Sequence, residues 1–500
     1  MSATASRRKF IQGAAASAAM VGLSRFTALS YGKIVGSNDK IRMGVIGFNG
    51  RGNAHIDAYR RIDGVELVAL CDADENVLNK GFDRVMKAGP TTAGAAAPKA
   101  SSPRMEKYID LRKLLDNKDI DAISTATPNH WHSLITVWGC QAGKDVYVEK
   151  PISHDIWEGR QAVKAARKYS RIVQTGTQNR SNAAVHEAVD WMKAGNLGKA
   201  LIGRAVVYNR RGSIGKVDAT PPVPKGIDLD LWCGPAPLEA PHRKQFHYDW
   251  HWFWQTGNGE MANNGIHEID IVRWILGKNE LSSSVMSVGG RFGYVDDAET
   301  PNTQFAIHNY GDVMMIMEVR GLPSKPASPK MDSYKTQSIG WIIECEGGYL
   351  AHTTAYDKDG KVIKKFTGGG IPEKQMQADH FSNFIDAVRS RKVSDLHADI
   401  EEGHLSTALC HTPNISYRLG RKADPDAIKA ALKSDPAAMD TFERFKEHLA
   451  VNEVNLSMDQ AVLGMPLKMD PKTEQFIDNA EANAMLKRTY RAPYVMPEMV

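Results

Sequence analysis

The feature that most constrains the fold is an alternation of short apolar runs with helical patterns, which begins at residue 41. The apolar runs end in turn or polar residues, and such continuous runs are typical of parallel strands that are covered on both faces. Strands that alternate with helices favour an α/β domain with a doubly wound parallel sheet. The predicted strands are 42–48, 66–71, 122–126, 146–148 and 172–175, and 157–169 is a predicted helix.

The pattern changes after about residue 180, where strands follow one another with few helices between them. Runs at 285–292, 313–319 and 340–344 are compatible with antiparallel pairing around one face. We therefore expect a second, α+β domain built on a large, mostly antiparallel open sheet. Residues 377–419 return to a helical pattern.

The N-terminus resembles an export signal. Arg7 and Arg8 precede an apolar, Ala-rich run at 13–23, as in a twin-arginine signal. The run is too short to span a bilayer, so we expect a periplasmic or otherwise exported protein with no membrane attachment after export. This route carries folded proteins, so a bound cofactor would travel with the chain. The five scattered cysteines, without a C-x-x-C pattern, predict neither a disulfide framework nor a zinc site.

Composition excludes nucleic acid as an expected partner. The net charge is +5 over 500 residues, and no long basic run is present. Apolar residues make up 42% and charged residues 24%, which is ordinary for a globular protein. The segment 88–103, rich in Pro, Gly and Ser, predicts a flexible surface insertion.

A glycine-rich turn, G-F-N-G-R-G at 47–52, follows the first predicted strand and opens a helix. Turns that bind dinucleotides have glycine at the first, third and sixth positions, because backbone N–H groups must approach a pyrophosphate at the helix N-terminus. Gly47 and Gly52 match, Asn49 replaces the middle glycine, and Gly50 follows it. Because asparagine tolerates left-handed backbone, Asn49 is a plausible substitute.

Asp72 ends the next predicted strand, 20 residues after Gly52. A carboxylate there accepts hydrogen bonds from both ribose hydroxyls and repels a 2′-phosphate, which favours NAD over NADP. Arg51 leaves NADP open, because its guanidinium could hold a phosphate. A glycine-rich surface turn without a ligand is the remaining alternative.

Lys150 lies directly after the predicted strand 146–148. A lysine at the carboxyl end of a parallel strand points into the ligand crevice of such a sheet. Near the positive ring of a nicotinamide its pKa would fall, which suits proton transfer. The alternative is a solvated surface lysine, which is the commonest environment of this residue.

Four motifs in this order and spacing resemble the Gfo/Idh/MocA oxidoreductase family, over residues 41–420. They are the turn 47–52, A-T-P-N-H-W-H at 126–132, E-K-P at 149–151 and G-I-H-E-I-D at 265–270. The resemblance implies an N-terminal Rossmann domain and a C-terminal domain whose open sheet commonly supports homodimers or homotetramers. It implies NAD(P)-linked oxidation or reduction of sugars and cyclitols, with a small-molecule carbohydrate as the partner.

The resemblance also implies roles for individual residues. Lys150 and His267 match the catalytic pair. The residues implied in cofactor binding are Gly47, Asn49, Gly50, Arg51, Asp72, Thr127, Asn129, His132, Glu149, Lys150, Gln178 and Asn179. The predicted organisation is a signal and linker at 1–35, an NAD-binding domain at 36–179, a substrate and oligomerisation domain at 180–425 and a C-terminal extension at 426–500.

One position departs from the family pattern. Many of these dehydrogenases carry Asp four residues before the catalytic histidine, where this chain has Asn263. On a helix, Asn263 and His267 would share a face and meet one ligand. Asn263 cannot act as a carboxylate base, and Asp270 is a candidate to supply part of that charge.

Further substrate candidates come from an aromatic segment and a nearby arginine. If 246–254 is extended, its aromatic side chains alternate with histidine and aspartate, and aromatic faces stack on sugars. An aromatic core at a domain junction is the alternative reading. We select Tyr248 and His251 as substrate contacts, with Arg180 beyond a predicted strand end. His130 and His132 suggest a metal pair, but no Cys or carboxylate is near, so we predict no metal site.

Two classes of activity fit these residues. The first is a sugar oxidoreductase that recycles a tightly bound cofactor, as in the glucose–fructose oxidoreductase branch of the family, because no NAD(H) pool is maintained outside the cytoplasm. The second is a redox-neutral glycosidase that oxidises a hydroxyl transiently, eliminates the aglycone, adds water and reduces the sugar again. A sugar-binding protein with a vestigial cofactor site is a more distant alternative, because Lys150 and His267 are both retained.

Overall fold

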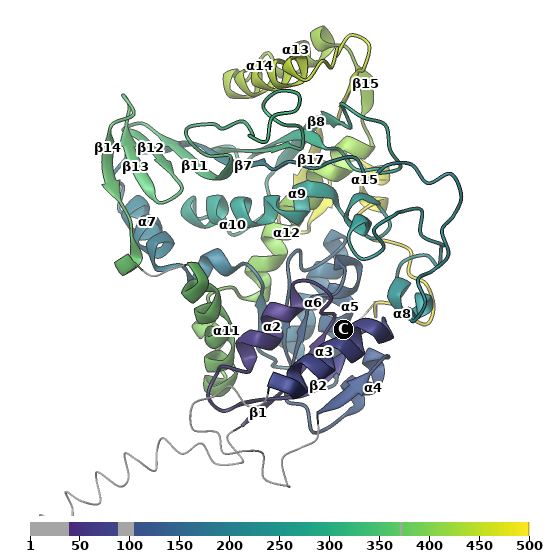
Figure 1. Cartoon of the computed structure of the whole chain (residues 1–500). Helices are drawn as coiled ribbons and strands as arrows, with labels where there is room; N and C mark the ends of the chain where they lie inside the picture. The colour runs from purple at the N-terminus through teal and green to yellow at the C-terminus, as the bar shows by residue number, and fades with distance from the viewer. Residues whose placement is uncertain (1–39, 89–104, 371–372, 499) are drawn as a thin grey trace, which may run out of the picture.

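The structure is a computed structural model that describes residues 40–88, 105–370, 373–498 and 500. The predicted export signal and nearly all of the predicted insertion at 88–103 lie outside these residues, and the domain boundaries remain predictions. Figure 1 shows two layered halves, with the N-terminal half below and the large sheet above. Within the described residues, no helix has the length and apolar character needed to cross a bilayer.

The lower half is a six-stranded sheet in the order β3-β2-β1-β4-β5-β6, and every pairing in it is parallel. This confirms the predicted doubly wound sheet. Its strands are β1 (Ile41–Ile46), β2 (Val65–Cys71), β3 (Glu106–Tyr108), β4 (Ala122–Thr125), β5 (Asp145–Val148) and β6 (Val173–Thr175). Its helices are α2 (Gly52–Tyr59), α3 (Glu75–Ala88), α4 (Leu111–Asp116), α5 (His132–Gln141) and α6 (Ile156–Lys168).

Both faces of this sheet are covered, which explains the continuous apolar runs. On β1, Met43 and Val45 pack in one core cluster with Ile56 of α2. Ile46 belongs to a second cluster, which contains Leu134 of α5. The strand order reverses between β1 and β4, so the carboxyl ends of these strands border a crevice.

The upper half contains a twelve-stranded sheet, whose main path is β14-β13-β12-β11-β7-β10-β9-β8-β16-β15. Apart from the parallel pair β7 and β10, its neighbouring strands are antiparallel, as predicted. The runs predicted as strands correspond to β8 (Ser284–Gly290), β10 (Met314–Arg320) and β11 (Ile339–Cys345). The other strands are β7 (Ala200–Tyr208), β9 (Thr303–Asn309), β12 (Gly348–Ala351), β13 (Thr354–Asp357), β14 (Val362–Lys365), β15 (Arg421–Ala423), β16 (Ala461–Leu463), β17 (Leu467–Asp470) and β18 (Gln475–Phe476).

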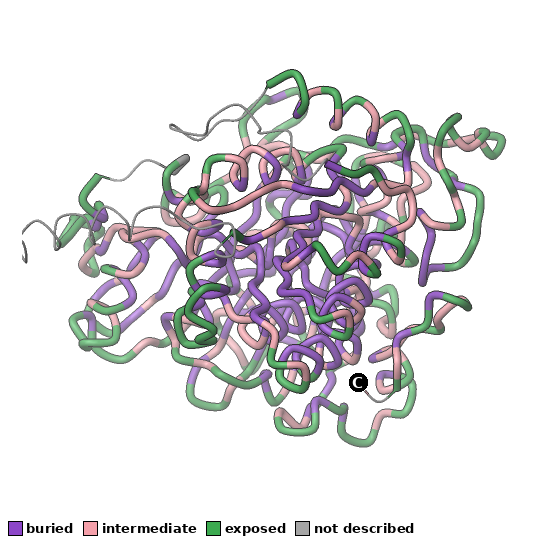
Figure 2. The backbone as a smooth tube through the Cα atoms, turned by 90° about the horizontal axis from the view of Figure 1, so that it is seen from below, coloured by how far each residue is buried: buried purple, intermediate pink, exposed green. Residues whose placement is uncertain are grey.

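Helices cover this sheet on opposite faces. Ala306 of β9 packs with the cluster that includes α10 (Gly265–Ile275) and α12 (Ile400–Arg418). The preceding residue, Phe305, packs on the other face against α13 (Pro425–Leu432) and α14 (Pro436–Val451). Figure 1 shows the same arrangement, with α14 above the sheet and α10 below it. Figure 2 shows that the buried residues form a continuous interior.

The remaining helices and turns are distributed between the two halves. They are α7 (Ala183–Lys193), α8 (Leu229–Cys233), α9 (Gly259–Asn263), α11 (Glu373–Ser390), α15 (Ala480–Ala484) and the 3₁₀ turns η1 (Asn129–Trp131), η2 (Gln178–Ser181), η3 (Asp249–Trp252), η4 (Gly368–Gly370) and η5 (Val393–Asp395). The C-terminal segment returns to the lower half, where Tyr494 packs in the core beside α5.

Candidate active site

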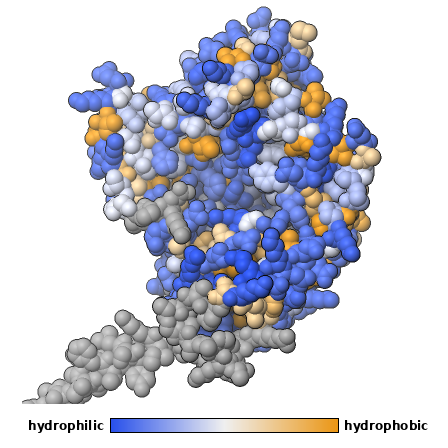
Figure 3. All heavy atoms as spheres, in the orientation of Figure 1, coloured by the Kyte–Doolittle hydropathy of each residue, from blue (hydrophilic) through white to orange (hydrophobic). Residues whose placement is uncertain are grey.

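A cavity of about 960 Å³, the main cavity, lies between the two halves. Its floor is formed by the carboxyl ends of β1, β2, β4 and β5, and its upper wall by residues 247–251, α9 and α10. Figure 3 shows that this face of the molecule is hollowed between the two halves. The volume lies within the range of roughly 300–1,000 Å³ that is usual for small-molecule sites.

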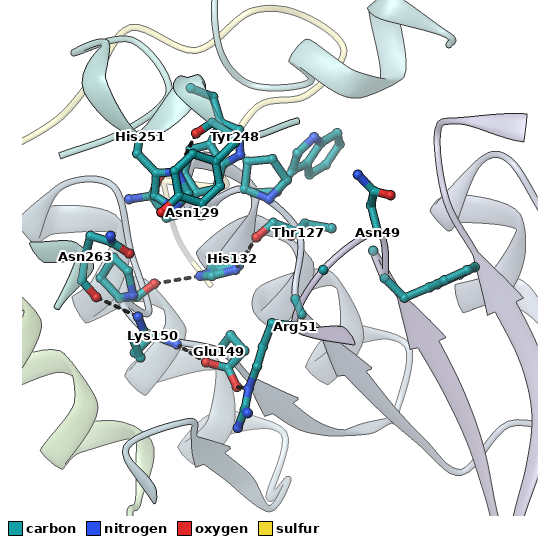
Figure 4. Close-up of a pocket in the computed structure, with 18 of the residues that line it drawn as sticks. Asn49, Arg51, Thr127, Asn129, His132, Glu149, Lys150, Tyr248, His251 and Asn263 are labelled. Atoms are coloured by element: carbon teal, nitrogen blue, oxygen red, sulfur yellow. Dashed lines mark hydrogen bonds and ion pairs between the residues drawn. The ribbon is translucent and has the colours of Figure 1, made fainter. Parts of the chain in front are cut away.

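All but one of the predicted site residues line the main cavity. They are Gly47, Asn49, Gly50, Arg51, Asp72, Thr127, Asn129, His132, Glu149, Lys150, Gln178, Asn179, Tyr248, His251, Asn263 and His267. Figure 4 shows that Asn49 lies at one end of this group, and Lys150 and Asn263 at the other.

Arg180 is the exception, and its predicted contact with substrate is not what the structure shows. Its guanidinium is buried and donates to both carboxylate oxygens of Asp270, at 2.7 and 2.9 Å. It also pairs with Glu402 at 3.0 Å. This ion pair occupies Asp270, which also accepts a hydrogen bond from Ser406, so Asp270 does not supply charge to His267 as we considered. Both side chains are buried and neither lines the main cavity.

The turn after β1 is shaped by two glycines. Gly47 has φ 73°, and a Cβ there would lie 2.7 Å from the Thr127 side chain. A Cβ on Gly52 would lie 2.2 Å from the carbonyl oxygen of Gly47. A Cβ on Gly50, in contrast, would meet no atom within 4 Å, so its backbone is open to the cavity. Asn49 does not have positive φ, so the left-handed conformation that we expected of it is absent.

Asp72 lies at the end of β2 beside this turn. Its carboxylate accepts hydrogen bonds from the backbone N–H groups of Phe48, at 3.1 Å, and Asp74, at 3.0 Å. Burial raises the pKa of Asp72 to about 6, although these two hydrogen bonds oppose the rise. The carboxylate is therefore held in place, with its remaining capacity to accept hydrogen bonds directed at the cavity.

Arg51 points toward Glu149 (Figure 4). Its Nε donates to Glu149 Oε1 at 2.9 Å, and its Nη1 donates to Gln377 Oε1 at 3.1 Å. Glu149 also contacts His55 Nε2 and accepts from Gln178 Nε2, each at 3.1 Å. Burial by itself would raise the pKa of Glu149, but Arg51 and His55 hold it well below its usual range. Glu149 is therefore an ionised anchor beneath the cavity.

Lys150 is held by the backbone at a break between two helices. Its Nζ donates to the carbonyl oxygen of Asn263 at 2.6 Å. Helix α9 ends at Asn263 and α10 begins at Gly265, so this carbonyl is free to accept. Asn263 and His267 thus lie on two successive helices, not on one as predicted, although both line the cavity. Burial lowers the pKa of Lys150, and Glu149 and Glu260 oppose this only in part.

His267 lines the main cavity together with Lys150. Burial and the nearby charge of Lys150 lower the pKa of His267 to about 3, so its ring is neutral near pH 7. No hydrogen bond to its ring nitrogens is found among the described residues. The ring is therefore free to bond a ligand.

Two carboxylates at this end were not predicted. Glu260 is buried and accepts hydrogen bonds from Arg211, Asn264 and Asn263, at distances of 2.6–3.1 Å. Glu268 lines the main cavity with only 6% of its surface exposed, and its Oε2 has no hydrogen-bond partner in the described parts of the chain. Burial raises the pKa of Glu268 to about 8. The only sequence signal for Glu268 is its position directly after His267.

The histidines of the 126–132 segment bind carbonyl groups. His132 bridges the carbonyl oxygens of Pro151, at 2.6 Å, and Thr127, at 2.8 Å. His130 contacts the carbonyl oxygen of Trp232 at 3.0 Å. Within the described residues, no three His, Cys, Asp or Glu side chains form a cluster suited to a metal ion.

The aromatic segment 246–254 is not extended as considered above, because it forms turns and the 3₁₀ helix η3. The expected alternation of faces is therefore absent. Tyr248 and His251 nevertheless both line the main cavity. The Tyr248 hydroxyl accepts a hydrogen bond from Arg211 at 2.8 Å, and the His251 ring stacks on Trp250 with 3.7 Å between ring centres. Local turn geometry, which the composition does not reveal, brings them there.

Several curated relatives match part of this chain. A glycosyl hydrolase family 109 protein of Shewanella pealeana is 27% identical over 192 residues, which are 38% of this chain and 40% of that protein. An alpha-N-acetylgalactosaminidase of Shewanella oneidensis is 26% identical over 179 residues, or 35% and 36% of the two chains. The chain thus spans about two fifths of the length of these relatives.

Solved structures share the fold. The WlbA dehydrogenase of Bordetella pertussis, determined with NADH and UDP-GlcNAcA, superposes with a TM-score of 0.56 at 20% identity, over 76% of this chain and 96% of that one. An oxidoreductase domain protein of Kribbella flavida gives a TM-score of 0.55 at 17% identity, over 75% and 96%. At such identities the likeness concerns the fold alone.

Family membership follows from the two domains. Residues 41–177 match the NAD-binding Rossmann fold of an oxidoreductase family, and residues 191–317 match the C-terminal alpha/beta domain of the same family. Together these segments exceed half of the 500 residues. With the parallel and the open sheet in the expected order, the chain belongs to the Gfo/Idh/MocA oxidoreductase family.

Proposed function

We propose that this protein is an NAD-dependent oxidoreductase that acts on a hydroxyl group of a sugar or sugar derivative and retains its cofactor between turnovers. One observation carries the proposal. The cavity that begins at the turn 47–52 ends at Lys150 and His267, a proton donor or acceptor and a free neutral imidazole. A single ligand-binding space therefore joins a dinucleotide turn to acid–base groups.

The residues of the turn fit a dinucleotide. Gly47 and Gly52 allow the tight turn, and the open backbone at Gly50 allows a pyrophosphate to approach. Asp72 is placed to accept hydrogen bonds from ribose hydroxyls. Nε and Nη1 of Arg51 are engaged by Glu149 and Gln377, which supports NAD over NADP because less of the guanidinium is left for a 2′-phosphate. NAD, when bound, supplies the acceptor for the hydride.

Lys150 and His267 have different roles in the proposed reaction. Oxidation of an alcohol requires that its proton be accepted, and the lowered pKa of Lys150 brings a neutral amine closer to physiological pH. The Asn263 carbonyl fixes the position of Nζ. His267 is too weak a base to keep a proton at neutral pH, so it orients the substrate by hydrogen bonding. Tyr248 and His251 supply aromatic and polar surface for the carbohydrate.

Two further parts of the proposal concern the location of the enzyme and its oligomeric state. Arg7 and Arg8 support export to the periplasm, where a captive cofactor has to be regenerated in place by a second substrate. The open sheet of the upper half supports a homodimer or homotetramer. Cell fractionation tests the first statement, and analytical ultracentrifugation of the purified chain tests the second.

The first experiment is acid extraction of the purified protein and identification of any released nucleotide. The same preparation is then mixed with sugars and glycosides while absorbance near 340 nm is followed. Stoichiometric NAD that is reduced by one sugar, and stays reduced until an acceptor is added, supports the proposal. The absence of retained nucleotide would contradict the captive cofactor.

A second candidate is the redox-neutral glycosidase, which the relatives named as glycosyl hydrolase family 109 proteins favour. In this reaction Lys150 and His267 would serve both the oxidation and the later reduction, so no net redox change remains. Release of an aglycone from a glycoside, with bound NAD and no lasting change near 340 nm, selects this candidate over the first.

A further inference from the structure

A second cavity, of about 320 Å³, adjoins the main one. Asn258 lines both cavities. Its side chain accepts a hydrogen bond from Asn129 Nδ2 at 2.7 Å and donates to the carbonyl oxygen of His154 at 3.0 Å. The walls of the second cavity come from residues 154–156, 254–258, helix α12 and the C-terminal segment 484–489. The family matches end at residue 317. Two of these walls, helix α12 and the segment 484–489, therefore lie outside the matched residues.

The second cavity is lined by polar side chains that have buried atoms without partners among the described residues, on His154, His411 and Asn414. His411 and Asn414 of α12 are 3% and 4% exposed. His411 Nε2 donates to the carbonyl oxygen of Ser153 at 3.1 Å, which leaves Nδ1 as an unpaired acceptor. Asn414 Nδ2 donates to the carbonyl oxygen of Asn258 at 2.9 Å, and its Oδ1 is unpaired. Because buried polar atoms are almost always paired, an occupant with donor groups such as hydroxyls is expected here.

The rest of the lining is cationic. Arg488 donates from Nη2 to the carbonyl oxygen of Gln255 at 3.0 Å, while its buried Nε and Nη1 have no partner in the described chain. Arg418 lies over the ring of Trp254, 5.2 Å from its centre. Neither guanidinium has a carboxylate within ion-pair distance in the described parts of the chain. Guanidinium groups are well suited to carboxylates and phosphates.

Carboxylates lie near both arginines but outside ion-pair distance: Asp155 and Glu158 near Arg488, and Glu299 near Arg418. Asp155 is the one carboxylate in the lining that the described residues provide, and it accepts from the backbone N–H groups of Glu158, at 2.9 Å, and Arg488, at 3.0 Å. The third cation, Lys487, pairs with Glu498. Within the described structure, neither Arg418 nor Arg488 therefore forms a direct ion pair, and both lie over a floor with unpaired acceptors.

We propose that the second cavity binds a small hydroxylated anion, a sugar acid or a sugar phosphate, with its oxyanion on Arg418 and Arg488 and its hydroxyls on His411 and Asn414. The two ligand types share an oxyanion on a polyhydroxy skeleton. This site is separate from the space between the turn 47–52 and Lys150, and it does not depend on the proposed function.

The test is calorimetric titration of the full chain saturated with NAD, so that the dinucleotide turn is not available to the added anions. The probes are D-gluconate, D-glucose 6-phosphate, D-glucose and inorganic phosphate. We expect one site per chain for gluconate or glucose 6-phosphate. Glucose, which lacks the oxyanion, and phosphate, which lacks the hydroxylated skeleton, should each bind at least about tenfold more weakly.

Variants locate the site. Arg418→Gln, at an exposed rim position outside the main cavity, should weaken binding of the preferred anion about tenfold. Arg421→Gln is the matched control, because Arg421 is exposed and lines neither cavity. Arg488→Gln is the second test variant, with its thermal midpoint measured to verify folding.

If no probe binds to the NAD-loaded chain, the cavity holds water only and the proposal is wrong. If an anion binds equally well to the parent chain, Arg418→Gln and Arg488→Gln, it binds elsewhere, and the proposal is also wrong. Binding that is lost in Lys150→Met but retained in Arg418→Gln would assign the anion to the main cavity and would likewise overturn the proposal.

Discussion

The two ends of the main cavity select their ligands by different means. At the turn 47–52 the shape of the backbone is decisive, because Gly47 and Gly52 have no room for a side chain. At the opposite end, Lys150, His267 and Glu268 have proton equilibria that burial moves away from their ordinary values. The steric requirement involves one close neighbour at each glycine, the Gly47 carbonyl for Gly52 and Thr127 for Gly47, whereas a displaced pKa depends on everything packed around the group.

The difference predicts that mutations at the two ends separate binding from turnover. Changes at the turn should act on nucleotide affinity and folding. Changes at the reactive end should act on rate and on pH dependence, with the nucleotide still bound. The following tests run from the largest expected effect to the smallest.

Lys150→Met should lower kcat/KM by about 10²–10⁴-fold, the usual contribution of a positioned acid or base. Retained NAD should be unchanged, because the turn 47–52 and Asp72 are untouched. His267→Gln should cost less, since a ring with a pKa of about 3 hydrogen-bonds without storing a proton. Steady-state kinetics and nucleotide extraction on the same preparations measure both. A larger loss in His267→Gln than in Lys150→Met would reverse the assignment of the two roles.

Glu268→Gln should stabilise the protein increasingly as pH rises. In the parent protein the native pKa of Glu268, about 8, lies above the unfolded value of 4.5. Between these pH values the unfolded state releases a proton that the native state keeps, so the parent protein loses stability as pH rises. The gain from removing the carboxyl should be roughly 4 kcal/mol greater at pH 9 than at pH 5. Urea unfolding at both pH values measures it. A gain independent of pH would show that the carboxyl is already ionised in the native state.

Gly52→Ala should lower the free energy of unfolding by roughly 1–3 kcal/mol, because its Cβ would lie 2.2 Å from a carbonyl oxygen. Gly50→Ala is the matched control: its Cβ meets nothing within 4 Å, so the nucleotide-free protein should keep its stability to within about 0.5 kcal/mol. Denaturant titration of nucleotide-free protein compares them. An equal loss of unfolding free energy in the two variants would mean that a Cβ at position 52 does not meet the Gly47 carbonyl oxygen.

Asp72→Asn should weaken NAD binding about tenfold and reduce the preference over NADP, because the charge that repels a 2′-phosphate is removed. Since the pKa of Asp72 is about 6, NAD affinity of the parent chain should also fall as pH drops below 6, and the Asp72→Asn substitution should abolish this dependence. Calorimetric titrations with NAD and NADP at pH 5.5 and 8 provide the measurement. An unchanged ratio of the two affinities would argue against a ribose contact.

Much of the fold could be predicted because its signals are local. The apolar runs that form β1, β2, β4, β5 and β6 reflect a sheet covered on both faces. The short β3, with the sequence Glu-Lys-Tyr, has no such run and escaped prediction. In the upper half, strands with few helices between them indicated an antiparallel sheet, but the parallel pairing of β7 with β10 joins strands more than a hundred residues apart and left no pattern.

The main cavity, like the fold, has features that the sequence predicts and features that it does not. The sequence by itself predicted the dinucleotide turn, Asp72 and Lys150, because each lies at the end of a short apolar strand, and the resemblance to the family singled out His267. Only the tertiary structure decided that Arg180 is neutralised by Asp270, that Arg51 is engaged by Glu149, and that Asn263 offers Lys150 its carbonyl. These contacts join residues 90 to 113 positions apart, so no local pattern encodes them. Arg51 meets Glu149 through the strand order of the parallel sheet, and the other two contacts depend on elements that pack against that sheet.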